Sequence, residues 1–312
     1  MAGHIVLNES TDTIGVMRGS LLVLIAVCLL PVGALVAADV VSTWNGTTGN
    51  WTDFARWSSD PLYPSSGNGG FTYDATINAG NVTQDVAGGI MIEQLTFGGG
   101  AITGDYELTV NGLFTWTGGT MIGTGTTYAN GGMLLSGGTE MKERTLVNAG
   151  LAVWSAGDLE WRSDWQRPAP QFNNISGATF EIRTDGTVYR SGPPYAVPVI
   201  FNNSGSVVKL SSTGTTAFNG TFNNTGAVEV QTGTLKFARA FSQTGDGVTA
   251  VHPGAALEGA NFSANRIINN GTITSKGSMT IGDPTTCDGY SGTGKVDAGG
   301  KTITLTSPGR AT

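Results

Sequence analysis

The sequence has few charged residues, almost no cysteine or histidine, and a large amount of glycine. Charged residues make up 12% of the 312 positions, and 48 positions are glycine. Disordered segments usually carry more charge and fewer β-branched and aromatic residues. No stretch after residue 40 shows a sustained apolar period of three to four residues, so we expect almost no helix there. The composition predicts packed strands joined by glycine-rich turns.

The scarcity of cysteine and histidine restricts the chemistry of the chain. Beyond the first 38 residues, only Cys287 and His252 remain. One cysteine cannot form an internal disulfide, and one cysteine with one histidine cannot complete a zinc site. We therefore expect no metal and no other cofactor.

The charge balance is acidic. Without the first 38 residues, which hold Arg18, Glu9 and Asp12, the 16 basic and 23 acidic residues become 15 and 21, a net charge of −6. A nucleic-acid partner would require a basic surface that neutralises phosphates. The charge therefore argues against nucleic acid as a partner.

Residues 1–38 have the layout of a secretory signal peptide. Arg18 precedes an apolar run that ends in small residues, and cleavage is expected after Ala37 or Ala38. Met17 stands where such a signal would start, so the true start of the protein is expected there. The alternative is an uncleaved membrane anchor, but the run is barely long enough to span a bilayer and Pro31 interrupts it. We expect an exported protein without a membrane span after cleavage.

A short sequence recurs along the chain. "FNNTGAVEVQTGTLKF" begins at Phe222, and close variants begin at Phe172, Phe201 and Ile268. The asparagine before each turn recurs after steps of 26, 29, 21 and 46 residues, the last being about two steps. A period in the twenties indicates a solenoid, in which each repeat buries its apolar face against its neighbours. The predicted turn ladder consists of Asn148, Asn174, Asn203, Asn224 and Asn270.

Within each repeat, apolar and polar residues alternate as in a strand. Val228 and Val230 are predicted to point inward, and in "VVKL" Val208 and Leu210 are predicted inside with Lys209 outside. Asparagine and glycine tolerate left-handed backbone, so Asn-x-Gly marks a corner. Asparagines stacked on successive coils can bond through their amides.

The predicted fold is all-β: a single-stranded, right-handed parallel β-helix. At roughly 23 residues per coil, the chain would form on the order of a dozen coils. We divide it into a signal peptide (1–38), a cap with the first strands (39–80), and β-helix repeats (81–312). Trp44, Trp51 and Trp57 are expected to close the apolar end of the solenoid. The alternative fold is an antiparallel β-sandwich, which the repetition of Phe-Asn-Asn disfavours.

Several motifs resemble those of exported bacterial β-helix proteins. "STWNGTTGNWTDFARWSS" (Ser42 to Ser59) and "LTVNGLFTWTGGTMIGTGTTYANGGMLLSGG" (Leu108 to Gly138) resemble autotransporter-passenger-like and filamentous-haemagglutinin-like surface proteins. The resemblance covers most of residues 42–280. It implies export to the cell surface or extracellular matrix and a structural or adhesive role, with no shared catalytic motif. Such proteins often continue into further domains, so the chain is expected to be a fragment or freely secreted.

The stretch Asp158–Gln171 is richer in charge and tryptophan than the repeats. Tryptophan faces beside carboxylates bind sugars, and polysaccharide lyases and glycoside hydrolases also use clustered carboxylates. The alternative, which we favour, is that Trp154 and Trp161 are core residues beside a solvated charged loop. Expected partners are surface glycans, other envelope proteins, or further copies of the chain in end-to-end or side-by-side contact. The candidate glycan contacts are Trp161, Arg162, Asp164 and Trp165.

Overall fold

The computed structural model describes residues 38–164, 166–193, 198–282, 289–297, 299 and 303–305. Residues 1–37 of the predicted signal peptide, Trp165 and Cys287 lie outside these residues. Within these residues, strands form nearly all the regular structure, and the helices are two short 3-10 turns, η1 (Phe54–Arg56) and η2 (Asn68–Gly70). In the part of the chain that is described, no helix has the length and apolar character needed to cross a membrane.

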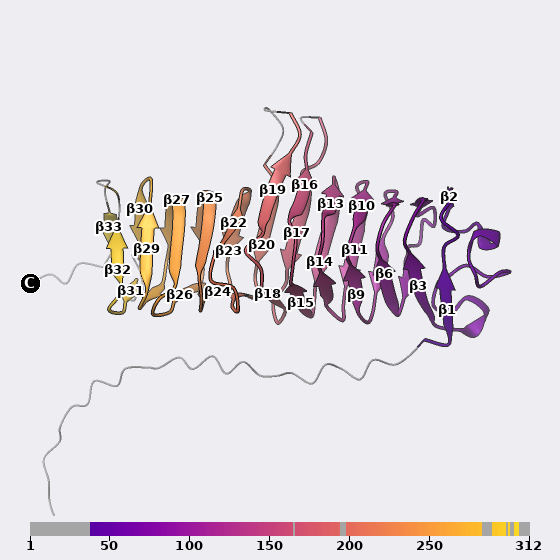
Figure 1. Ribbon diagram of the computed structural model, residues 1–312, viewed down its shortest axis with the longest axis horizontal. Coiled ribbons are helices and arrows are strands. Elements are labelled where there is room, and N and C mark those ends of the chain that lie inside the picture. Colours follow the sequence, from indigo (N-terminus) through magenta and orange to yellow (C-terminus); the bar gives the residue numbers. More distant parts are fainter. Residues whose placement is uncertain are drawn as a thin grey trace, which may run out of the picture. The chain divides into compact units, whose positions relative to one another are not determined.

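The described chain is a parallel β-solenoid whose coils, from the second onward, contribute strands to three faces (Figure 1). Every pairing between successive coils on the first face is parallel. This face is a 12-stranded sheet. Its strands are β1 (Val40–Thr43), β3 (Tyr73–Ile77), β6 (Gln94–Phe97), β9 (Phe114–Trp116), β12 (Met133–Leu135), β15 (Leu151–Trp154), β18 (Thr179–Ile182), β21 (Ser206–Lys209), β24 (Ala227–Val230), β26 (Val248–Val251), β28 (Ile267–Asn269) and β31 (Tyr290–Ser291).

The second face follows the first within each coil. Two of its strands are long and continue around a corner onto the third face. Its strands are β2 (Thr48–Asn50), β4 (Asn81–Thr83), β7 (Ala101–Thr103), β10 (Gly119–Ile122), β13 (Thr139–Lys142), β16 (Leu159–Arg162), β19 (Thr187–Ser191), β22 (Thr215–Phe218), the first parts of β25 (Thr234–Gln243) and β27 (Ala256–Ala264), β29 (Thr272–Ser275) and β32 (Lys295–Asp297).

The third face completes each coil. It receives residues 240–243 of β25 and residues 261–264 of β27. Its other strands are β5 (Ile90–Ile92), β8 (Leu108–Val110), β11 (Thr126–Ala129), β14 (Thr145–Asn148), β17 (Gln171–Asn174), β20 (Ile200–Asn203), β23 (Thr221–Asn224), β30 (Met279–Ile281) and β33 (Ile303–Leu305).

The phenylalanine of Phe-Asn-Asn forms part of a continuous aromatic stack in the core. Phe172 and Phe201 have ring centroids 4.8 Å apart, and Phe201 and Phe222 follow at 5.0 Å. The stack continues to Phe241 at 5.7 Å and Phe262 at 5.5 Å. Parallel in-register pairing places each ring on the ring of the coil before it, so the repeat recurs because each coil fills the same core position.

The alternation predicted for "VVKL" is wrong. Val207 and Lys209 point inward, whereas Val208 and Leu210 are only half-buried. The register of the neighbouring coils decides the direction, because Val207 lies opposite the core residues Phe180 and Val228. The sequence itself fits either alternation, since both choices place one valine inside.

The Lys209 side chain is fully buried, and its ammonium group donates hydrogen bonds to protein oxygens. Its Nζ lies 2.7 Å from Ser212 Oγ, 2.8 Å from Thr216 Oγ1 and 3.2 Å from Asp185 Oδ1. Burial lowers the pKa of Lys209, although the bond to Asp185 opposes that shift.

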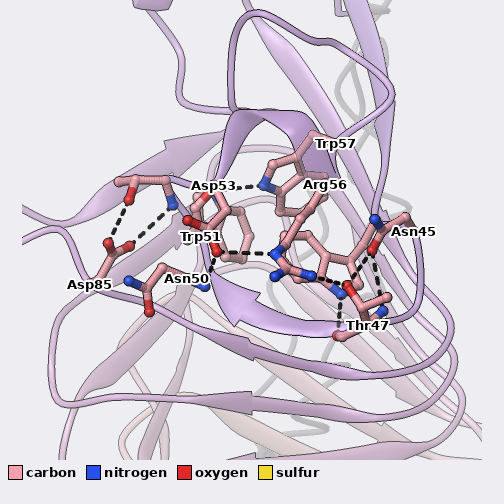
Figure 2. A network of polar contacts seen from close by, with 10 residues as sticks. Asn45, Thr47, Asn50, Trp51, Asp53, Arg56, Trp57 and Asp85 are labelled. Atoms are coloured by element: carbon pink, nitrogen blue, oxygen red, sulfur yellow. Dashed lines mark hydrogen bonds and ion pairs between the residues drawn. The ribbon is translucent and has the colours of Figure 1, made fainter.

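Trp44, Trp51 and Trp57 pack together at the first coil and are buried. The ring centroids of Trp44 and Trp57 lie 5.0 Å apart, as do those of Trp51 and Trp57. Figure 2 shows the polar contacts around them, in which Arg56 pairs with Asp53 at 3.1 Å. These contacts fix the loop over the aromatic cluster at the end of the first face.

A second set of bonds in Figure 2 joins this loop to the next coil. Asp85 accepts hydrogen bonds from the backbone N–H of Thr52 at 3.1 Å and from its hydroxyl at 2.5 Å. The tryptophan indoles also have backbone partners: Trp57 Nε1 donates to Trp51 O at 2.7 Å. The buried indoles therefore lose no hydrogen bond on folding.

Candidate glycan-contact site

Trp161 is a core residue and cannot serve as a sugar platform. Its side chain is 3% exposed and stacks on Phe172 and Phe201, with ring centroids 6.2 Å away in each case. It pairs in register with Met141, which also points inward on β13. The assignment of Trp161 as a glycan contact is therefore wrong, and the core interpretation of Trp161 and of the fully buried Trp154 is correct.

The four candidate contacts do not form one site. Arg162 is exposed on the outer side of β16, where its NH1 atom lies 3.8 Å from Glu140 Oε1. Asp164 follows the strand and is half-buried, and Trp165 lies outside the described residues. The drawn parts of the connections after β16 and β19 both extend beyond those of the other coils (Figure 1).

An open groove does lie beside Arg162, on the outer side of the second face. Its volume is about 350 Å³, and it extends across β10, β13, β16 and β19. Glu140, Glu160 and Tyr189 occupy equivalent positions on three successive strands. The lining residues are Gly119, Thr120, Gly138, Thr139, Glu140, Asp158, Glu160 and Tyr189.

Each carboxylate of the groove accepts a hydrogen bond from a neighbouring coil. Tyr189 donates to Glu160 Oε2 at 2.8 Å, and Thr120 Oγ1 donates to Glu140 Oε2 at 3.0 Å. Asp158 Oδ1 accepts from the backbone N–H of Thr187 at 2.7 Å. The carboxylates are thus fixed as acceptors, an arrangement that can hold hydroxyl or ammonium donors of a ligand.

The hydroxyl of Tyr189 is held in its protonated form. The hydrogen bond to Glu160 raises the pKa of Tyr189 to about 12, and burial and the nearby carboxylates add to the shift. The charge-rich stretch Asp158–Gln171 singled out in the sequence contains Asp158 and Glu160, but Tyr189 and Glu140 lie on other coils and were not predicted. In the described part of the chain, no group of three or more His, Cys, Asp or Glu residues is arranged to hold a metal ion.

The predicted asparagines form most of a buried amide ladder inside the third face. Nδ2 of Asn148 donates to Asn174 at 2.8 Å, Asn174 donates to Asn203 at 2.7 Å, and Asn203 donates to Asn224 at 2.7 Å. Asn224 then donates to Gln243 at 3.3 Å. The ladder is therefore an internal hydrogen-bonded link between successive coils.

Asn270 does not belong to this ladder. It follows β28 on the first face and is exposed, whereas the position after Gln243 on the third face is occupied by Ala264. The neighbouring Asn269 is the buried residue there, and its Nδ2 donates to Lys295 O at 3.1 Å. The prediction that the 46-residue step spans two coils of one ladder is wrong, because the step leads from Asn224 on the third face to Asn270 on the first.

Sequence reasoning also missed a buried arginine that joins three coils. Arg144 is fully buried; its Nε donates to Thr127 Oγ1 at 2.8 Å and its NH1 to Gly104 O at 3.0 Å. Thr127 lies one coil back and Gly104 two coils back. Burial lowers the pKa of Arg144 to about 10. This side chain is a structural clamp.

Comparisons with protein-family models, with curated proteins and with solved structures found no match. The fold is therefore assigned from the strands and their registers. The resemblance to exported bacterial surface proteins rests on the sequence motifs alone.

Proposed function

We propose that this protein is an exported, non-enzymatic β-solenoid of a bacterial surface or matrix, with a structural or adhesive role. The proposal rests on the unbroken series of packing contacts and hydrogen bonds that join successive coils. The aromatic stack begins at Phe172 and the amide ladder at Asn148, and both run through the coils of β17, β20, β23 and β25, a stretch of sequence that contains no cysteine. Such a solenoid presents long outer faces suited to many weak contacts.

The position of Trp161 supports a passive role. Trp161, one of the two tryptophans predicted to contact a sugar, is packed in the core, and the groove lined by Glu140 and Glu160 is open. A glycosidase would need two carboxylates on opposite sides of a bound sugar. Here Glu140 and Glu160 lie side by side on adjacent strands, each bonded to a protein hydroxyl.

A sedimentation assay with the purified full chain tests this proposal. The chain would be mixed with isolated bacterial envelopes and a panel of insoluble polysaccharides, and the supernatants assayed for protein and for released sugars. We expect retention in the pellet and no sugar release. Sugar release that Glu160→Gln abolishes would contradict the non-enzymatic role. Absence of binding to all of the envelopes and polysaccharides would contradict the adhesive role.

A second candidate function is the binding of an amine-bearing glycan in the groove. Three carboxylates line the groove beside a tyrosine that remains protonated at neutral pH. Retention on insoluble chitosan should then fall in Asp158→Asn and with added salt, because the attraction is between charges. Glu258→Gln, on the outer side of the same face, is the matched control, and equal loss in both variants would contradict this assignment.

A further inference from the structure

The strands of the third face carry no charge. Among the described strands, this face contains no Asp, Glu, Lys or Arg from β5 to β33, although 12% of the whole sequence is charged. The outer sides of the other faces do carry charge, for example Glu181 on the first face and Lys236 and Glu258 on the second. The coils therefore sort their charged residues between faces.

From β17 onward, the outer side of this face presents one small polar residue per coil. These residues are half-buried or exposed, and each pairs with the next in register. We call this column the amide face. It consists of Asn173, Asn202, Asn223, Ser242, Ser263 and Thr280.

The amides of this column are ordered before any ligand binds. Asn202 Nδ2 donates to Asn173 Oδ1 at 2.8 Å, and Asn223 Nδ2 donates to Asn202 Oδ1 at 2.9 Å. A carboxamide has two N–H donors and two acceptor lone pairs, so the central Asn202 keeps one of each for a ligand. Because the side chains are already fixed, a ligand does not have to order them. The groups repeat at the strand spacing of about 4.8 Å.

We infer that the amide face is the docking surface for an extended, uncharged polysaccharide that lies along the coils. This inference rests on the proposed adhesive function and names its ligand class. Sugar hydroxyls donate and accept, as carboxamides and serine hydroxyls do, so the two arrays are complementary. The face offers no counter-charge to an ionic polymer.

A second copy of the chain fits this face less well. Interfaces between protein copies have an apolar core enriched in aromatic residues. Each of the strands β17, β20 and β23 has one further outward side chain beside the amide face. These are Gln171, Ile200 and Thr221, and among them only Ile200 is apolar. Once one unit of a polymer is bound, its next units are held close to the next coils, so many weak polar contacts together raise the overall affinity. This favours a long polymer as the ligand.

The test is a depletion assay with the full chain and the variant Asn202→Ala/Asn223→Ala. The probes are microcrystalline cellulose and insoluble β-1,3-glucan as neutral polymers, with chitosan as the charged one. The matched control is Thr179→Ala/Ser206→Ala, which removes two outward hydroxyls from the first face of the same coils. Far-UV circular dichroism and the melting midpoint check that both variants fold.

We expect the asparagine variant to bind a neutral polymer at least about fivefold more weakly, and the control to bind like the unmodified chain. Binding should also change little between about 0.05 and 0.5 M salt, because no ion pairs are involved.

Several outcomes would overturn the inference. Unchanged binding by the asparagine variant, or equal loss in the control, would place the contact elsewhere while leaving the adhesive function intact. Retention on chitosan or envelopes but on no neutral polymer would overturn the ligand class alone. A dimer in sedimentation velocity that the asparagine variant converts to a monomer would identify a second copy as the occupant. If the unmodified chain bound none of the polymers or envelopes, the proposed adhesive function would be contradicted as well.

Discussion

Asn174 donates a hydrogen bond of 2.7 Å to Asn203, which occupies the same position one coil further along. The same Nδ2 also donates to Ser206 O at 2.9 Å, so one amide joins the side-chain ladder to the backbone of the following strand. Both residues are buried. Buried amides need partners, and each amide of the ladder has one only if the neighbouring coil also carries an amide at this position.

Asn203→Ala should destabilise the protein substantially. The substitution removes the acceptor of Asn174 and leaves Ala227 O, which accepts from Asn203 at 2.9 Å, without this partner. Each buried group left unsatisfied costs about 1–3 kcal/mol in unfolding free energy. Urea denaturation followed by circular dichroism measures the loss. Asn202→Ala, on the outside of the same strand, should cost less than about 0.5 kcal/mol, and an equal cost for both would contradict the ladder's role.

Lys209→Met should be neutral or stabilising at pH 7. The methionine fills a similar volume, and the remaining Asp185 carboxylate is half-exposed and can be hydrated. Thr216 keeps a partner, because its hydroxyl donates to Thr184 O at 2.5 Å. Thermal melts of the two proteins at pH 7 make the comparison, with Lys236→Met on the outer side of the second face as control. A loss of several kcal/mol in Lys209→Met would show that the ammonium contacts outweigh its burial.

The difference between these two proteins should depend on pH. Burial lowers the pKa of Lys209 below its ordinary value of about 10.4. Between the lowered folded value and the unfolded value, the unfolded chain binds more protons than the folded chain, so the unfolding free energy rises with pH. The unmodified protein should therefore gain stability relative to Lys209→Met as the pH is raised from 7 to about 10. A difference that stays constant would contradict the shift.

Trp161→Ala should be far more damaging to stability than Arg162→Ala. Truncating a buried tryptophan costs about 3–5 kcal/mol through lost transfer free energy and the cavity left behind. Arg162 is exposed, and its contact with Glu140 at 3.8 Å is a surface pair of little value. Denaturation midpoints would separate the two, and a stable Trp161→Ala protein with weakened glycan binding would restore the role that the structure rejects.

Tyr189 should titrate abnormally. The hydrogen bond to Glu160 raises its pKa to about 12, so its phenolate absorbance should appear above that of an ordinary tyrosine. Subtracting the titration of Tyr189→Phe isolates the signal, and Glu160→Gln should move it downward by removing the charge. The raised pKa contributes stability below pH 10 that is lost as the pH rises to about 12. An ordinary tyrosine titration in the unmodified protein would contradict this hydrogen bond.

Much of the fold could be predicted because its signals are local. The period of the repeat, the alternation around Val228 and Val230, and the absence of helical periodicity each follow from neighbouring residues in one segment. Val228 and Val230 point inward as their spacing predicts. The recurrence of asparagine at nearly equal steps likewise identified most of the amide ladder, because stacked coils repeat the same corner.

The tertiary structure decided everything that depends on how one coil aligns with the next. It turned Lys209 inward, because the register against Phe180 and Val228 overrides an ambiguous local pattern. It placed Trp161 between two phenylalanines that are distant in the sequence. Loops of unequal length set these alignments. Asn270 therefore lies outside the amide ladder, and Tyr189 donates a hydrogen bond to Glu160 although the two are 29 residues apart in the sequence. The sequence alone determined that the coils stack, and the tertiary registers determined which side chains meet on each face.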